Sequence, residues 1–347
     1  MRPAALFRRK FGLLAFLTIA VGCGGAGGGE KAAVTGSAKY DDLTSLFSDW
    51  RAFQKPKIVE GVPDYSASAM ATQHSDLAAY QARLRAIDPG AWPIEQQVDY
   101  QIVRAEMNGL DFDHRVLKPW ANNPAFYVTV FSGESDQPAR EGPYALGAVD
   151  LWTYKHPLSA ADAAAIDSGI RAVPKLLEQA KKNLVGNHKD IWNFGIRDLK
   201  GQSAELESFA SQLTGDQQEL RGDVAKAKEA TDQLVSWAES QAGSKTAPSG
   251  IGVDNYNWYL KNVQLLPYTW QDLVTIMEVE LARSWAFLAL EEERNKKLPP
   301  LPIVSSTEEH ARRFNGAVTE YMAYLRNHDL LTIKDYMEPR LRAQIGG

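Results

Sequence analysis

The chain contains six histidines, and imidazole is a common zinc ligand in enzymes that cleave amide bonds. A helical H-E-x-x-H zinc site needs two histidines four residues apart, because that spacing places both rings on one helix face. The histidines are His74, His114, His156, His188, His310 and His328, and no two of them are four residues apart. The sequence therefore predicts no catalytic residue and no metal ligand of this kind. Convergence of distant histidines is the alternative that spacing leaves open.

Two other catalytic motifs are present only in incomplete form. Gly201–Glu205 departs from the G-x-S-x-G nucleophile elbow at its last position, and Gly243–Thr246 lacks the adjacent Gly-Lys pair of a phosphate-binding loop. Acidic runs at 291–293 and 308–309 have arginines close by, which is typical of solvated helix faces.

An aromatic block after a Pro-Ser-Gly loop is the best candidate for a ligand-facing surface. It contains Tyr256, Trp258 and Tyr259, and aromatic rings suit contact with peptide side chains and backbone. We predict substrate binding here. The alternative is that the rings only pack this loop onto the helical body.

A long helix follows, opening at Thr269 with Asp272 in its first turn and stopping before Pro299. Its apolar residues recur at steps of three and four, which predicts a buried face: Leu273, Ile276, Met277, Leu281, Trp285 and Leu288. Glu280 lies among these positions. A carboxylate there must find a partner or remain near water, so we include Glu280 among the candidate binding residues.

The N-terminus predicts export. Residues 1–22 combine a cationic start with an apolar run, Phe11–Val21, that is too short to span a bilayer. The run ends at Ala20-Val21-Gly22-Cys23, which resembles a bacterial lipobox, and Cys23 is the only cysteine. A single thiol has no partner for an internal disulfide. We therefore predict a signal peptide at 1–22 and lipid attachment at Cys23, with an ordinary cleaved signal peptide as the alternative.

Charge and composition limit the possible partners. The signal segment carries four Lys or Arg residues and no acid, so its removal changes the net charge from −5 to −9. An acidic body argues against nucleic-acid binding, which needs a basic face. The glycine-rich residues 23–38 predict a flexible tether, and the lipid would then be the contact with the membrane.

From Tyr40 onward the apolar period is helical, which predicts an all-α, multi-helical array over residues 39–347. Ser66, Ser159, Thr214 and Ser306 are predicted to begin helices. Residues 120–147 interrupt the pattern with proline and glycine, and the run 126–131 fits either a strand or an irregular helix entry.

Several weak patterns occur together in one order along the chain. They are the Gln96–Tyr100 run, the Ile170–Leu184 segment, the tyrosine block Gly252–Leu260, Pro267–Thr269, and the helix carrying Glu278, Glu280 and Leu281. This order resembles the bacterial "domain of unknown function 885" family. The resemblance implies a helical, zincin-like fold, with zinc expected only in a complete member. It also implies that the tyrosine block would line a channel leading to the metal.

Two hypotheses follow. In the first, the chain is the N-terminal portion of a metallopeptidase-like protein, truncated or split and inactive alone, whose partner is the missing C-terminal half. In the second, it is a stand-alone helical lipoprotein that binds a peptide or a protein. Both place it in the bacterial envelope, in the periplasm or on the outer membrane if one is present.

Overall fold

The computed structural model describes residues 38–133, 145–215, 217–300 and 302–344. These residues are predominantly α-helical, which confirms the predicted all-α array. The predicted helical domain divides into two compact units, the first ending at Gln271 and the second beginning at Asp272. None of the described helices is long and apolar enough to cross a bilayer. The signal peptide, the tether and Cys23 lie outside the described residues.

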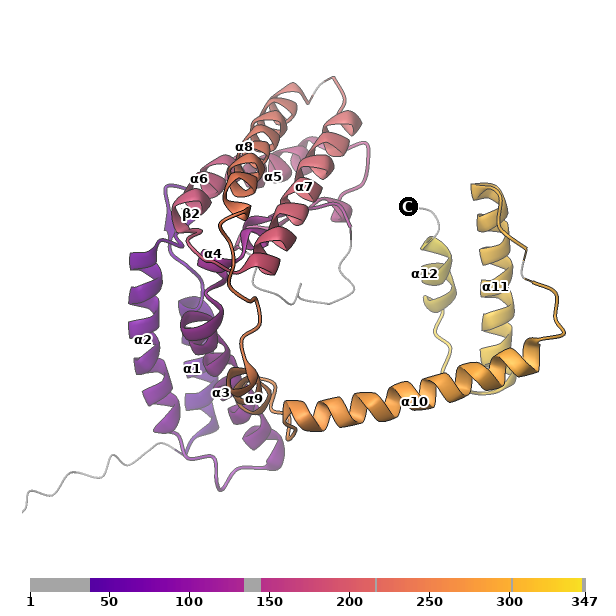
Figure 1. Ribbon diagram of the computed structural model, residues 1–347, viewed down its shortest axis with the longest axis horizontal. Helices are drawn as coiled ribbons and strands as arrows, with labels where there is room; N and C mark the ends of the chain where they lie inside the picture. The colour runs from indigo at the N-terminus through magenta and orange to yellow at the C-terminus, as the bar shows by residue number, and fades with distance from the viewer. Residues whose placement is uncertain (1–37, 134–144, 216, 301, 345–347) are drawn as a thin grey trace, which may run out of the picture. The chain divides into compact units, whose positions relative to one another are not determined.

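The first unit opens with three helices around a small core. They are α1 (Tyr40–Phe53), α2 (Ala67–Arg85) and α3 (Ile94–Phe112), with a hairpin of β1 (Ile58–Val59) and β2 (Val62–Pro63) after α1 (Figure 1). The buried residues of this core come from all three helices: Leu43, Leu46, Trp50, Leu77, Leu84, Val103 and Met107. The helix predicted to begin at about Ser66 is confirmed, and the Oγ of Ser66 caps it by accepting a hydrogen bond from the amide of Ala69.

Irregular structure connects this core to the rest of the unit. The elements are a π-helical turn η1 (Asp113–Leu117), α4 (Pro119–Asn122), a 3₁₀ turn η2 (Pro124–Tyr127), β3 (Val130–Phe131), β4 (Val149–Asp150) and a 3₁₀ turn η3 (Leu151–Thr153). The run 126–131 therefore combines both predicted alternatives. It begins as an irregular helix and ends as a two-residue strand, which pairs in parallel with β4.

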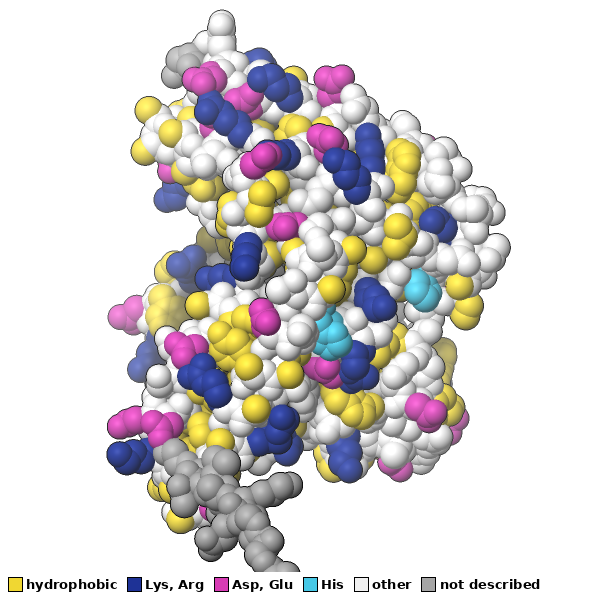
Figure 2. All heavy atoms as spheres, turned by 90° about the vertical axis from the view of Figure 1, so that its left-hand side faces the viewer, with side chains coloured by type: hydrophobic (Ala, Val, Ile, Leu, Met, Phe, Trp, Pro, Cys, Tyr) yellow, Lys and Arg dark blue, Asp and Glu magenta, His cyan; other side chains and the backbone are white. Residues whose placement is uncertain are grey.

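Five further helices complete the first unit, and four of them contribute to the larger core. They are α5 (Ala160–Ile170), α6 (Val173–Asn183), α7 (Lys189–Gln212), α8 (Gln218–Ala242) and α9 (Val253–Asn262). Trp192, Leu199 and Leu206 of α7 are fully buried beside Leu234 of α8. On the face drawn in Figure 2, acidic and basic side chains are interspersed.

A buried amide ties the irregular segment to these helices. Gln202 of α7 is 1 % exposed, and its Oε1 accepts hydrogen bonds from the amides of Thr129 (2.7 Å) and Val130 (3.1 Å). Its Nε2 donates to Oγ1 of Thr231 on α8 at 3.1 Å. The side chain thus satisfies backbone groups that a two-residue strand cannot pair by itself.

The second unit contains α10 (Trp270–Asn295), α11 (Thr307–Asn327) and α12 (Met337–Ala343). α11 packs on α12 through Val318, Met322 and Leu325, which contact Met337 and Leu341 of α12. Arg342 of α12 also donates to Oγ1 of Thr319 at 2.8 Å. The predicted cap at Ser306 is confirmed, because its Oγ accepts from the amide of Glu309 at 3.1 Å.

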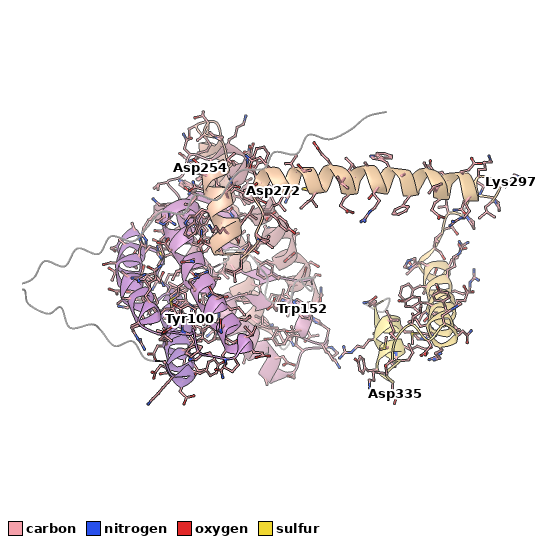
Figure 3. The ribbon with its side chains drawn as sticks, turned by 90° about the horizontal axis from the view of Figure 1, so that it is seen from below. Tyr100, Trp152, Asp254, Asp272, Lys297 and Asp335 are labelled. Atoms are coloured by element: carbon pink, nitrogen blue, oxygen red, sulfur yellow. The ribbon has the colours of Figure 1, made fainter. Side chains whose placement is uncertain are left out.

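The prediction that α10 buries its apolar face is wrong within this unit. None of its 26 residues is buried, and Met277, Leu281 and Trp285 are all at least 59 % exposed. The physical reason is that α11 and α12 use their apolar residues to cover each other. Figure 3 shows side chains projecting from α10 on all sides between the labelled Asp272 and Lys297.

Two glycines of α7 allow a matched test of packing. A Cβ at Gly195 would lie 2.7 Å from the amide nitrogen of Ala125 and from Pro124, whereas one at Gly201 would meet nothing within 4 Å. We expect Gly195→Ala to lower the free energy of unfolding by roughly 1–3 kcal/mol through overpacking. We expect Gly201→Ala to raise it by up to about 1 kcal/mol through helix propensity. Urea unfolding of both variants tests this, and equal effects would contradict the close approach of α7 to η2.

Candidate functional site

The end of α3 widens into a π-helical turn, and π turns occur often at functional sites. The α-helix ends at Phe112, η1 covers Asp113–Leu117, and Lys118 closes it with a φ of +43°. The amide of Lys118 donates to the carbonyl of Asp113 at 2.7 Å. The candidate site is built from five consecutive residues: Asp111 and Phe112 at the end of α3, and Asp113 to Arg115 in η1.

Phe112 joins this turn to the predicted aromatic block. It is 1 % exposed, its ring stacks on Trp258 of α9 with centroids 5.6 Å apart, and the Tyr259 ring lies 5.1 Å away. Tyr259 Oη also accepts a hydrogen bond from Gln264 at 2.8 Å. Trp258 and Tyr259 therefore have packing roles, whereas Tyr256 is 39 % exposed and available for contact. A binding role for the three residues stays a prediction.

Asp111 and Arg115 form the polar side of the same turn. Arg115 Nε donates to Oδ2 of Asp111 at 2.6 Å, and its guanidinium lies 4.9 Å from the ring centroid of Trp258. The other carboxylate oxygen of Asp111 lies 3.2 Å from Nε2 of His74 on α2. Asp111 of α3 therefore contacts α2 and η1, and Arg115 extends the network to α9.

The structure brings together two histidines that are forty positions apart in the sequence. The rings of His74 and His114 are stacked, with centroids 5.0 Å apart and an angle of 9° between planes. Nε2 of His114 lies 3.0 Å from Oε1 of Gln73. Burial lowers the pKa of His114 to about 4, with a further lowering from His74 and an opposing effect from Asp111. His114 is therefore neutral at pH 7.

Asp113 differs from its neighbours because its carboxyl group has no hydrogen-bond or ion-pair partner among the described residues. It lies half-buried in a groove of about 400 Å³, beside Ala105, Gly109 and Val263. Burial raises the pKa of Asp113 to about 7. Such a carboxyl group without a charge partner is a candidate for ligand contact.

The remaining predicted binding residue belongs to the second unit. Glu280 lies on α10 in the second unit, where it forms an ion pair with Arg283, one turn further along. The partner that a carboxylate at this position requires is therefore local.

One group of carboxylates has the spacing of metal ligands. Asp167 of α5 and Glu219 and Asp223 of α8 have oxygens within 4.8 Å of one another. Arg171 lies among them and forms ion pairs with all three, with its Nε 2.8 Å from Asp223 Oδ2. The guanidinium already supplies the positive charge, so this group is an ion cluster joining α5 to α8.

The contact between His74 and His114 and the unpaired carboxyl group of Asp113 were not predicted from the sequence. Nothing in the spacing of His74 and His114 indicates their contact, because it depends on how α2 packs against α3. The run Asp111–Arg115 did carry a signal, since two acids flank an aromatic residue and are followed by a histidine and an arginine.

Asp113 should make the stability of the protein dependent on pH. Its pKa is raised in the folded state, so its ionisation costs folding free energy that grows as pH rises from about 4 to 7. We expect Asp113→Asn to stabilise the protein by about 1–2 kcal/mol more at pH 8 than at pH 5. Urea unfolding at both pH values measures this, and a difference that shrinks with rising pH would refute it.

The chain is similar to one family of bacterial proteins and to one solved structure. A family model described as "Bacterial protein of unknown function (DUF885)" matches residues 55–338. A solved structure titled as that of a "putative lipoprotein of unknown function" from Shewanella oneidensis is similar to this chain, with a TM-score of 0.51 and 13 % identity. The similarity covers 86 % of this chain and 59 % of that one, so this chain spans about three fifths of its length. A search of the curated proteins gave no match.

The family match extends over most of the chain, from the end of α1 to the start of α12, and so includes the π turn, the aromatic block and α10. At 13 % identity, the solved structure supports the fold alone. The chain belongs to the DUF885 family of bacterial proteins of unknown function.

Proposed function

We propose that this chain is an exported, lipid-anchored envelope protein whose second unit docks onto a further, metallopeptidase-like helical body. That body would carry the H-E-x-x-H metal helix, and this chain would be inactive without it. The observation that carries the proposal is α10, a helix of 26 residues of which its own unit buries none.

The distribution of apolar side chains on α10 is that of a helix from the interior of a larger protein. At 100° per residue, Met277, Leu281 and Leu288 fall on one side, and Val279 and Leu290 fall nearly opposite. All five are between 46 % and 68 % exposed. A helix that is apolar around most of its circumference is normally buried, so it needs cover on more than one side.

The charges on α10 favour an apolar partner. Glu280 pairs with Arg283, Glu291 with Arg294, and Glu293 with Lys296, each within one turn of the helix. Because these charges are compensated locally, association through α10 depends mainly on removing apolar surface from water. A helical body with its own apolar face meets that requirement.

The greater length of the similar solved structure supports the proposal of such a body. This chain spans 59 % of that chain, so the related fold contains many residues that have no counterpart here. The resemblance to helical zinc peptidases makes metal-dependent peptide hydrolysis the expected chemistry of the complete assembly. The aromatic block and the π turn of the first unit would then bind peptide.

The alternative is a stand-alone lipoprotein that binds a peptide or protein in the envelope. The exposure of Tyr256 beside the ordered stack of Trp258 and Phe112 supports it, because an aromatic ring on a rigid helix is a suitable contact residue. This alternative requires a chain that is stable and monomeric by itself.

Association measurements distinguish the two functions. We expect the purified Cys23→Ser chain to self-associate at micromolar concentration. Replacing Met277, Leu281 and Leu288 with glutamine should weaken association at least about tenfold, because each exposed side chain contributes roughly 1 kcal/mol or more when covered. Light scattering across a dilution series measures the change.

The matched control replaces three exposed apolar residues of the first unit, Ile58, Val59 and Val185, with glutamine. This control should leave association unchanged. A sharp, monomeric melting transition of the unsubstituted chain would instead support the stand-alone function.

Lipid attachment is tested separately. We expect Cys23→Ser to block lipidation and to release the protein from the membrane fraction, because the acyl chains are the proposed anchor. Membrane fractionation and the mass of the mature N-terminus report this. Unchanged membrane retention and processing in the variant would exclude Cys23 as the anchor.

A further inference from the structure

The groove beside α3 is formed by small residues on one helix face and by the turn that follows α9. Ala105 and Gly109 form its floor, four residues apart, and Val263 and Leu265 form the opposite wall. A Cβ at Gly109 would lie 3.5 Å from Val263 Cγ1, so the two elements are in close contact at the base. The small side chains leave the groove open above that contact.

The wall of the groove is held in an unusual backbone conformation. Leu265 has a φ of +54°, a region that leucine rarely adopts, and its side chain is 38 % exposed. The neighbouring amides fix the turn, since Leu266 donates to the carbonyl of Leu260 at 2.8 Å and Gln264 to that of Tyr259 at 3.1 Å. Strain held by surrounding bonds in this way is frequent at ligand sites.

The groove contains one acid, Asp113, that has no matching cation among the described residues. Asp113 closes one end and has no pairing partner among the described residues, and Glu106 lies at the rim. Glu106 forms an ion pair with Arg51 at 3.9 Å, so Asp113 is the carboxyl group left for a ligand. No lysine or arginine belongs to the described lining. Glu106 and Asp113 are seven residues apart and therefore share the helix face that forms the floor.

We infer that this groove binds a primary ammonium group carried on an apolar chain, supplied by a lysine side chain or by the N-terminus of a polypeptide. The ammonium pairs with the carboxylate of Asp113, and the hydrocarbon portion packs on Ile102, Ala105 and Leu265. The inference is independent of the role proposed for α10.

The composition of the groove selects this ligand over a metal ion. Hard divalent cations need several oxygen ligands at short distance, and the described residues place no third carboxylate or imidazole with Asp113 and Glu106. An ammonium ion needs only one carboxylate and few further acceptors, and the amide oxygen of Gln264 in the lining can act as one of them. The apolar walls then suit an aliphatic stem.

Calorimetric titration of the Cys23→Ser chain with three small probes tests the inference. Nα-acetyl-lysine methylamide presents a side-chain ammonium, leucine methylamide presents an N-terminal one, and Nα-acetyl-norleucine methylamide is the uncharged control. We expect at least one ammonium probe to bind with a Kd on the order of 1 mM, and the control to bind at least tenfold more weakly. The probe that binds more tightly identifies the source of the ammonium.

Variants complete the test. Asp113→Asn keeps the shape and removes the charge, so it should weaken the bound ammonium probe at least about tenfold. Gly109→Leu should block the groove to every probe, and Glu95→Gln, an exposed acid on the same helix, should change nothing. Equal binding of the norleucine control, unchanged affinity in Asp113→Asn, or no binding of either ammonium probe would overturn the inference.

Discussion

The widened turn at the end of α3 is the constraint on which the candidate site depends. A regular α-helix would place successive side chains 100° apart, and the residues after Phe112 would follow that progression. Phe112, the last residue of the α-helix, stacks on Trp258, whereas His114 in the π turn reaches His74 on α2. Asp113, between them, faces the groove on the same side as Glu106. Three consecutive residues at this helix end thus have three different environments.

In the second unit, the constraint is the burial of apolar side chains. α11 and α12 satisfy each other through Val318, Met322 and Leu325, and this leaves α10 without a partner in its unit. Exposed apolar surface on this scale is unfavourable in water and normally marks an interface. The first unit therefore contains a candidate site within a packed body, whereas the second unit contains a helix, α10, that needs cover.

The sequence predicted what depends on local pattern. The helical period from Tyr40 onward and the helix starts at Ser66, Ser159 and Ser306 needed only neighbours within a few residues, and the structure confirms them. The start predicted at Thr214 is wrong by three residues, because Gln217 precedes the first residue of α8. Burial of α10 was predicted from the same kind of pattern and failed, because a pattern shows that a helix needs cover without showing what supplies it. The contact of His74 with His114 could not be predicted, since it depends on tertiary packing.

Asp113 and Asp167 show why burial alone does not identify a binding carboxylate. Burial raises the pKa of both residues. Asp167, however, has Arg171 one helical turn away, so the protein itself supplies the opposite charge. The same guanidinium pairs with Glu219 and Asp223 and thereby joins α5 to α8. Asp113 has no such neighbour, although Arg115 is only two residues further along, because the turn directs that guanidinium to Asp111 and Trp258 instead. What separates the structural carboxylate from the candidate site is therefore the direction in which the nearest cation points.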